Sequence, residues 1–342
     1  MMPVPILVWG AAALISAIFG GKKALDAHDK YSNAKSINCE ANRMAIRAER
    51  TIYAAREQVE ISFKNLGSQK LEILIKSMTD FQEAFSQIHS INVTQTNSLG
   101  HSIGTIDLNF VENLRTITLN AKDIAFGAGQ AGFAGALTAF GTYGTVALLG
   151  HASSGTAIAT LSGIAAKNAT LAYLGGGSIA AGGGGMAAGA IILGGLITGP
   201  AIAVGGFIAD NKAQVALEKA RTNIADAQRF LYQANMIETN MKIIFYRVNE
   251  MIALLQNLDV YFINSNSLLR KVVEQEGTNF QKYSSKGQGI VFKTFKIAQV
   301  INGLINVDLL TEKGELTKKS EEQIQTANTF LFEILDYGEV QE

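Results

Sequence analysis

The sequence is poor in the residue types that most often mark disulfides and metal sites, with one cysteine and four histidines in 342 residues. The single thiol, Cys39, excludes a disulfide bond within the chain and is expected to be a small, partly buried helical residue. His28, His89, His101 and His151 are scattered without the spacing of metal ligands. No nucleophile, base and orienting acid can be grouped from the sequence either. We therefore predict no enzyme, and no catalytic, cofactor-binding or metal-binding residue.

An excess of charge of one sign is also missing. Lysine and arginine together number 29, as do aspartate and glutamate. The balance holds locally, with 13 basic against 12 acidic residues in 1–123 and 15 against 17 in 210–342. A nucleic-acid-binding protein needs a clustered basic face. The sequence therefore predicts no nucleic-acid partner.

Alternating apolar and polar patterns, which are typical of strands, are nearly absent. The segment GAGQAG at 127–132 matches a dinucleotide-binding fingerprint in its letters. That fingerprint requires a preceding strand and an acidic residue about twenty positions further on, and neither is found here. We interpret the match as coincidence and expect an all-α fold.

Apolar residues recur at three- and four-residue steps in residues 24–66, 69–89 and 107–123, which predicts helices there. Asn65 and Gly67 are expected to end the first of them. Residues 211–262 contain no proline or glycine and predict a helix of about 75 Å. We expect this helix to pack antiparallel to the long N-terminal one. Further helices are expected at 265–282, 290–305 and 318–337, with a turn at 311–317.

The middle of the chain has a very different composition. Residues 124–209 contain 22 glycines and 22 alanines among 86 residues, and Lys167 is their only lysine, arginine, aspartate or glutamate. Two windows, 126–150 and 186–209, are long enough to cross about 30 Å of hydrocarbon as helices. We therefore divide the chain into an apolar N-terminal helix at 1–21, a first half of a helical bundle at 22–123, a hydrophobic hairpin at 124–209 and a second bundle half at 210–342. The predicted architecture is an elongated bundle of long helices around a central Gly/Ala-rich helical hairpin.

The hairpin supplies the candidate site residues. The side chains expected to enter the membrane are Phe126, Phe133, Leu137, Phe140, Leu148, Leu149, Ile191, Ile192, Leu193, Leu196, Ile197, Ile202 and Phe207. Small residues that let helices approach closely are Gly132, Gly155, Gly163, Gly185 and Gly189. Lys167 is expected near the hairpin tip, either reaching the far membrane interface or standing as a solvated loop charge.

Two alternatives stay open at this point. The first twenty residues carry no lysine or arginine, unlike a secretory signal, and fit a partial membrane anchor, an interfacial helix or a buried bundle helix equally well. Glycine and alanine gain little from leaving water, so the hairpin could instead be buried within a soluble bundle.

The block GHASSGTAIATLSGIAAKNATLAYLGGGSIAAGGGGMAAGAIILGGLITGPAIAVGG, at 150–206, resembles a Gly/Ala-rich block of many poorly characterised bacterial proteins. In those proteins the block also lies between long helices, and residues 66–88 and the N-terminal MMPVPILVWGAAAL are similar to the same group. The group implies no established activity. More loosely, long helices around an apolar hairpin resemble α-helical pore-forming cytolysins in architecture.

These observations predict a bacterial protein whose hairpin enters the inner membrane, with or without a soluble cytoplasmic form. Several copies would then assemble with the lipid bilayer into a pore or a disruptive patch, as in a toxin or a defence effector. The alternative is a membrane-anchored helical scaffold that binds a protein partner through its long helices and has no pore activity.

Overall fold

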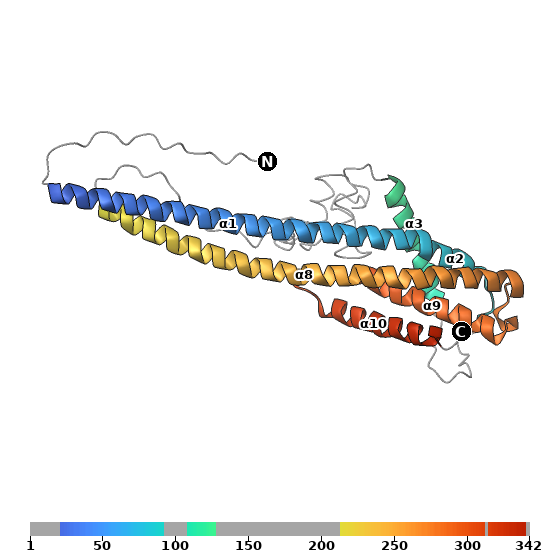
Figure 1. The fold of residues 1–342 in the computed structure, drawn as a ribbon. Helices are drawn as coiled ribbons and strands as arrows, with labels where there is room; N and C mark the ends of the chain where they lie inside the picture. The colour runs from blue at the N-terminus through green and yellow to red at the C-terminus, as the bar shows by residue number, and fades with distance from the viewer. Residues whose placement is uncertain (1–20, 92–107, 128–212, 312–313, 340–342) are drawn as a thin grey trace. The chain divides into compact units, whose positions relative to one another are not determined.

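The computed structural model describes residues 21–91, 108–127, 213–311 and 314–339. The elements of these residues are α1 (Gly21–Ile73), the π-helix η1 (Leu74–Met78), α2 (Thr79–Phe85), α3 (Leu108–Gly127), α8 (Ala213–Glu276), the 3₁₀-helix η5 (Phe280–Lys282), α9 (Ser285–Asn306) and α10 (Lys318–Glu339) (Figure 1). This part of the chain contains no strand and only two isolated bridges. The prediction of an all-α fold is therefore confirmed.

The described residues fall into two compact units. Unit 1 contains residues 21–50 of α1 and 213–235 of α8, and unit 2 contains all the others. Each unit therefore includes one stretch of α1 and one stretch of α8.

Unit 1 has a core made largely of alanine. Ala34, Ala216 and Ala220 form a buried cluster, against which Ile37 and Leu217 pack. Ala41 and Ala48 are also buried and follow Ala34 at steps of seven along α1. Ala227 and Ala234 are buried and follow Ala220 at the same steps along α8. A seam of alanines lets two helix backbones approach closely. Asn38 accepts a hydrogen bond from Asn223 at 2.9 Å, and a polar pair of this kind in an apolar seam fixes the register of two helices.

Unit 2 continues the repeat of seven with larger residues. Buried positions on α1 recur as Ile52, Val59, Leu66 and Ile73. Buried positions on α8 recur as Val248, Leu255, Phe262 and Leu269, with a second series of Ile244, Met251, Leu258, Ser265 and Val272. Apolar residues at alternating steps of three and four keep one face of a helix against its partner. The two helices therefore pair through a coiled-coil type of seam.

The direction of this pair differs from the prediction. In unit 2, bonds join Gln256 to Gln69, Asn266 to Ser77 and Arg270 to Asp80, at sequence separations of 187, 189 and 190. Residue numbers increase together on both helices, so α1 and α8 run parallel (Figure 1). The antiparallel prediction was wrong because periodicity identifies the apolar face of a helix but carries no information about its direction.

The helix that begins with α1 continues through η1 into α2 without the break expected at Gly67, which lies buried inside α1. Between them, η1 is a one-turn π-helix, a widened turn that leaves carbonyl groups without their usual partners. The hydroxyl of Thr79 donates to the Leu74 carbonyl at 3.0 Å, and Asn266 Nδ2 of α8 donates to the Ser77 carbonyl at 2.9 Å. Side chains thus satisfy the backbone of the widened turn.

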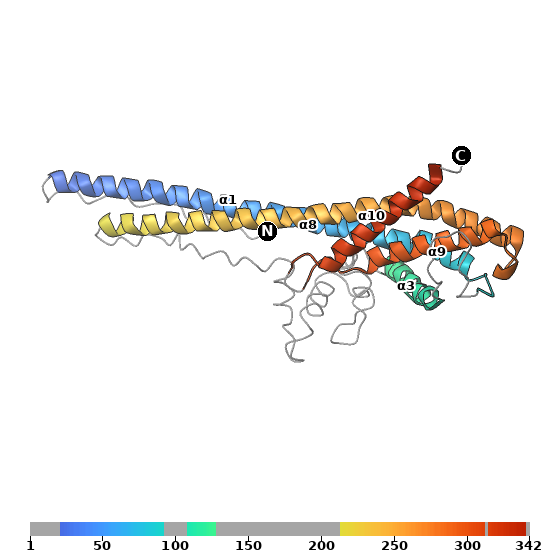
Figure 2. The ribbon, with the colours of Figure 1, turned by 90° about the horizontal axis from the view of Figure 1, so that it is seen from below.

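Phenylalanine rings form the centre of unit 2. The ring of Phe295 on α9 lies 5.5 Å from that of Phe85 and 5.4 Å from that of Phe110 on α3. Phe81 of α2 lies 5.7 Å from Phe262 of α8. Around these rings, α3 packs against η1 and α2, and α10 packs against α9 (Figure 2).

The connection from α8 to α9 is defined by local hydrogen bonds. Gly277 ends α8 with a φ of +84°, a conformation that glycine adopts without strain. Ser284 then caps α9, because its hydroxyl accepts a hydrogen bond from the Gly287 amide at 3.0 Å. The first part of the helix expected at 265–282 thus belongs to the end of α8, and the helix expected at 290–305 lies within α9.

Within the described helices, no stretch is both long and apolar enough to cross a membrane. Charged or strongly polar side chains recur along each helix, as with Asp259 and Asn266 in the most apolar part of α8. This finding contradicts the prediction of a membrane-inserting pore former, which was wrong together with its transmembrane helices. Among the predicted hairpin residues, Phe126 belongs to the last turn of α3. The others, Lys167 and the packing glycines included, lie outside the described residues, as does the N-terminal apolar segment.

Candidate functional site

The described residues contain no arrangement suited to metal binding. They include no group of three or more histidine, cysteine, aspartate or glutamate side chains able to hold an ion. Cys39 is exposed on α1, not partly buried as expected, and His28 and His89 are exposed as well. His101 and His151 lie outside the described residues. The candidate sites are therefore a pocket, a buried ionisable group and an exposed apolar stripe, all in unit 2.

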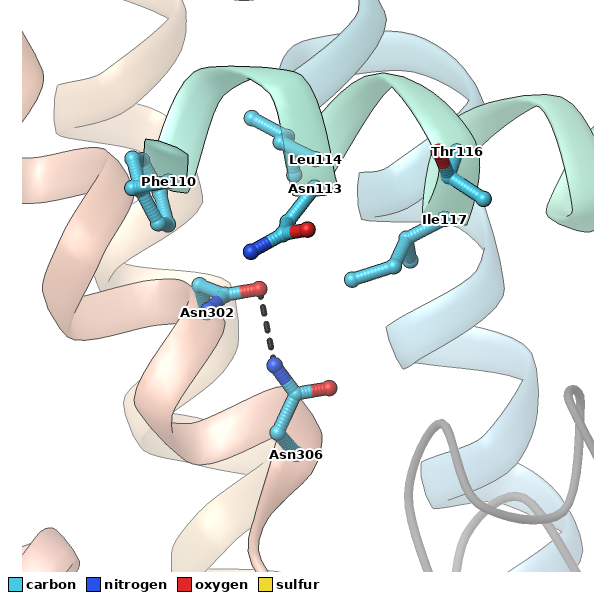
Figure 3. A pocket seen from close by; sticks show the side chains of 7 residues that line it. All are labelled: Phe110, Asn113, Leu114, Thr116, Ile117, Asn302 and Asn306. Carbon is cyan, nitrogen blue, oxygen red and sulfur yellow. Dashed lines mark hydrogen bonds between the residues drawn. The ribbon is translucent and has the colours of Figure 1, made fainter. Parts of the chain in front are cut away.

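The pocket lies between α3 and α9 and has a volume of about 440 Å³ (Figure 3). On the α9 side it is lined by Asn302 and Asn306, which are four residues apart and therefore on one face of the helix. Asn306 Nδ2 donates a hydrogen bond to Asn302 Oδ1 at 2.9 Å, which orients both amides.

The opposite wall of the pocket comes from α3. Asn113 directs its amide toward Asn302 across the pocket, and Ile117 points into the space beside them (Figure 3). Phe110, Leu114 and Thr116 complete the lining. The Phe110 ring meets Phe295 edge-on, with an interplanar angle of 81°, so the aromatic core of unit 2 holds this wall in place. The lining described here mixes neutral amides with apolar surface and has no charged side chain.

A lysine lies in the core of unit 2. Lys70 of α1 is fully buried, four residues after Leu66 and three before Ile73, in the apolar seam itself. Burial lowers the pKa of Lys70 to about 7, because the charged form loses its hydration, and the charge of Asp308 offsets part of this effect. Burial also raises the pKa of Asp308, while Lys319 and Lys70 act in the opposite direction. The amine of Lys70 has no exposed surface, so the pKa shift links its protonation to the stability of the fold.

A second polar cluster lies where α8 meets the π-helix. Burial raises the pKa of the Asp259 carboxyl, and a hydrogen bond with Ser77 opposes that shift. Asn266 is fully buried and uses its amide nitrogen to bond the Ser77 carbonyl. Both contacts join α8 to Ser77 of η1, which explains why these two polar residues lie where α8 meets the widened turn.

The outer face of α8 carries an exposed apolar stripe, which we define as Met236, Ile243 and Tyr246. These side chains are 53 %, 53 % and 68 % exposed. Their steps of seven and three place them on one side of the helix. The charged residues within this stretch, Glu238 and Lys242, pair with each other at 2.8 Å. The stripe is therefore a nearly neutral apolar surface about three turns long.

Comparison of the chain with protein-family models, with curated proteins and with solved structures gives no match. The resemblance to a Gly/Ala-rich bacterial group therefore stays a prediction. The class that the structure itself defines is an all-α protein built on a parallel pair of long helices.

Sequence reasoning missed all three sites. The signal for Lys70 was a lysine at a position that the apolar repeat assigns to the core. The signal for the stripe was a set of large apolar residues on α8 beyond those needed for one buried face. No signal marks Asn302 and Asn306, because asparagines four apart on a helix are ordinary surface residues unless another wall faces them.

Proposed function

We propose that this chain is a non-enzymatic helical scaffold that assembles by packing another helix along the Met236–Ile243–Tyr246 stripe. The observation that carries the proposal is the exposure of three large apolar side chains on one face of α8. A row of such residues on a helix fits the apolar face of a second helix. The membrane anchor of the original alternative depends on residues outside those described and is not part of the proposal.

The stripe is favoured over the outer face of α1 by its charge. On α1, the exposed Tyr53 and Ile61 are separated by Arg56, Glu57 and Glu60, three charges that leave a net charge of −1 and would have to be desolvated in an interface. On α8, the only charges between the three apolar side chains belong to the Glu238–Lys242 pair. Burying the α8 stripe therefore has the lower electrostatic cost.

The partner must contribute an apolar face of its own. Three side chains that are half to two-thirds exposed present on the order of 300 Å² of apolar area, worth about 7 kcal/mol when buried. Association costs about 4 to 15 kcal/mol in lost freedom, so one stripe against a polar surface gives little binding. Two equivalent stripes double the gain to about 14 kcal/mol. The α8 stripe of a second copy meets this requirement, and twofold symmetric dimers are the commonest assemblies. A second copy is therefore the partner to which we commit.

Sedimentation equilibrium of the full chain tests this proposal. We expect concentration-dependent association between about 1 and 100 µM. The double variant Ile243→Asp, Tyr246→Asp should raise the dissociation constant at least 100-fold, about 2.7 kcal/mol, because it places charges in the seam. The matched control is Tyr53→Asp, Ile61→Asp, the same two changes at exposed apolar positions of α1, outside the stripe. The proposal would be contradicted if the unaltered chain stayed monomeric throughout this range, or if the two double variants self-associated equally well.

A further inference from the structure

We propose that the pocket between α3 and α9 binds a small neutral molecule that carries a planar amide edge beside an apolar or aromatic group. This inference concerns different elements from the α8 stripe and does not depend on the proposed function. The volume of about 440 Å³ lies within the range of pockets that hold small molecules.

The polar lining selects the hydrogen-bonding groups of the ligand. Asn113 and Asn302 face each other from the two walls, and Asn306 holds the Asn302 oxygen through its own amide nitrogen (Figure 3). A carboxamide offers both a carbonyl acceptor and N–H donors. A primary carboxamide or a lactam edge of a heterocycle presents the complementary donor and acceptor side by side. A ligand with only donors or only acceptors would leave amide groups of the pocket unpaired.

The absence of charge in the described lining selects against ions. The side chains that line the pocket are amides, a hydroxyl and apolar groups. A carboxylate or ammonium moved into this space would lose hydration without gaining a counter-charge. A neutral ligand does not incur this penalty, so charge discriminates between molecules of the same shape.

The apolar lining selects the rest of the ligand. Leu114 is 1 % exposed and forms the base of the α3 wall, while Ile117 and Phe110 lie on either side of it along the helix. The edge-on contact with Phe295 prevents Phe110 from rotating freely and leaves a preformed aromatic surface. A flat ring joined to the amide edge would cover this surface.

Two matched pairs of probes test the inference on the full chain. Nicotinamide and uracil are neutral and carry a carboxamide and a lactam edge, respectively, whereas nicotinate and orotate are their anionic counterparts. Calorimetric titration should give a dissociation constant of about 1 mM or lower for at least one neutral probe, and at least tenfold weaker binding for its anion. The neutral probe that binds better identifies the amide as a carboxamide or as a nucleobase-type lactam.

Variants connect binding to the pocket. Asn302→Leu keeps the size of the side chain and removes its amide, so it should weaken binding of the neutral probe about tenfold. Asn257→Leu, the same change on the exposed face of α8, should leave binding unchanged. Asn113→Ala alters an exposed position of α3 and gives the same test if Asn302→Leu disturbs folding. The inference is overturned if no neutral probe binds at 10 mM, if the anions bind equally well, or if binding survives both Asn302→Leu and Asn113→Ala.

Discussion

Replacing Lys70 with methionine should stabilise the protein, and the gain should shrink as the pH rises. Methionine keeps the length of the side chain and removes its ionisable amine. Lys70 is fully buried in the seam between α1 and its neighbours, where the loss of hydration of its charged form outweighs the attraction of Asp308.

The size of the effect follows from the two pKa values of Lys70, about 7 in the folded protein against 10.5 for the free side chain. The difference of about 3.5 units corresponds to roughly 5 kcal/mol at about 1.36 kcal/mol per unit. Because the folded pKa is lowered, the unfolded chain binds more protons between pH 7 and 10.5, and the stability of the unaltered protein rises across this window. The destabilisation caused by burying the charged amine is fully present below pH 7. Between pH 7 and 9, the free energy of unfolding of the unaltered protein should rise by about 2 kcal/mol. That of Lys70→Met should show no such rise, because the variant has no amine at this position.

Urea denaturation followed by far-ultraviolet circular dichroism at pH 6, 7, 8 and 9 measures this difference. The free energy of unfolding of Lys70→Met should exceed that of the unaltered protein by several kcal/mol at pH 7 and by about 2 kcal/mol less at pH 9. Lys64→Met, the same substitution at an exposed position of α1, should follow the unaltered protein at every pH. Stability curves for Lys70→Met and the unaltered protein that run parallel between pH 7 and 9 would refute the reasoning.

Two further predictions concern backbone and packing, and both use urea denaturation. Ala55→Leu should lower the free energy of unfolding by about 1 to 3 kcal/mol, because residue 55 is 7 % exposed and lies in the seam. Ala54→Leu, at the next position toward the N-terminus and exposed, should change it by less than about 0.5 kcal/mol. Equal effects of the two substitutions would place the seam elsewhere on α1. Gly277→Ala should lower the free energy of unfolding by about 1 kcal/mol, because φ at this residue is +84°. Gly289→Ala lies inside α9 with open space around the added methyl group, so it should raise the free energy of unfolding by up to about 1 kcal/mol. A gain in stability at residue 277 would contradict the left-handed conformation.

The helices themselves could be predicted from the sequence, because their apolar periodicity is strong. The expected helices at 107–123 and 318–337 correspond to α3 and α10, and the expected turn at 311–317 contains Gly314 with a φ of +77°. The points at which a helix ends were harder to predict. Gly67 does not end α1, and the polar Ser265 and Asn266 do not end α8, because tertiary contacts supply what local propensity lacks.

The packing of the helices and the pocket could be predicted much less well. Four alanines, Ala216, Ala220, Ala227 and Ala234, and Phe230 form the buried face of α8 in unit 1, whereas the large apolar Leu217 and Leu231 are only partly buried. A close helix pair prefers small residues at its contact line, which an average over hydrophobicity does not reveal. The pocket depends on which face of α3 meets which face of α9, a relation between segments far apart in the chain.

The widened turn at Leu74–Met78 is the one point in this helix where the chain can gain or lose a residue without changing which side chains face the core. Phe63 and Lys70 are buried seven residues apart, Met78 follows eight residues later across the turn, and Phe85 follows seven after that, so the turn absorbs one extra residue without rotating the buried face. Deleting one amino acid within the turn would restore ordinary α-helical geometry and leave Phe81 and Phe85 facing Phe295, whereas the same deletion earlier in α1 would rotate the preceding part of the helix by about 100° relative to them. In related sequences, a gap of one residue should therefore be found at this turn more often than elsewhere in α1 or α2.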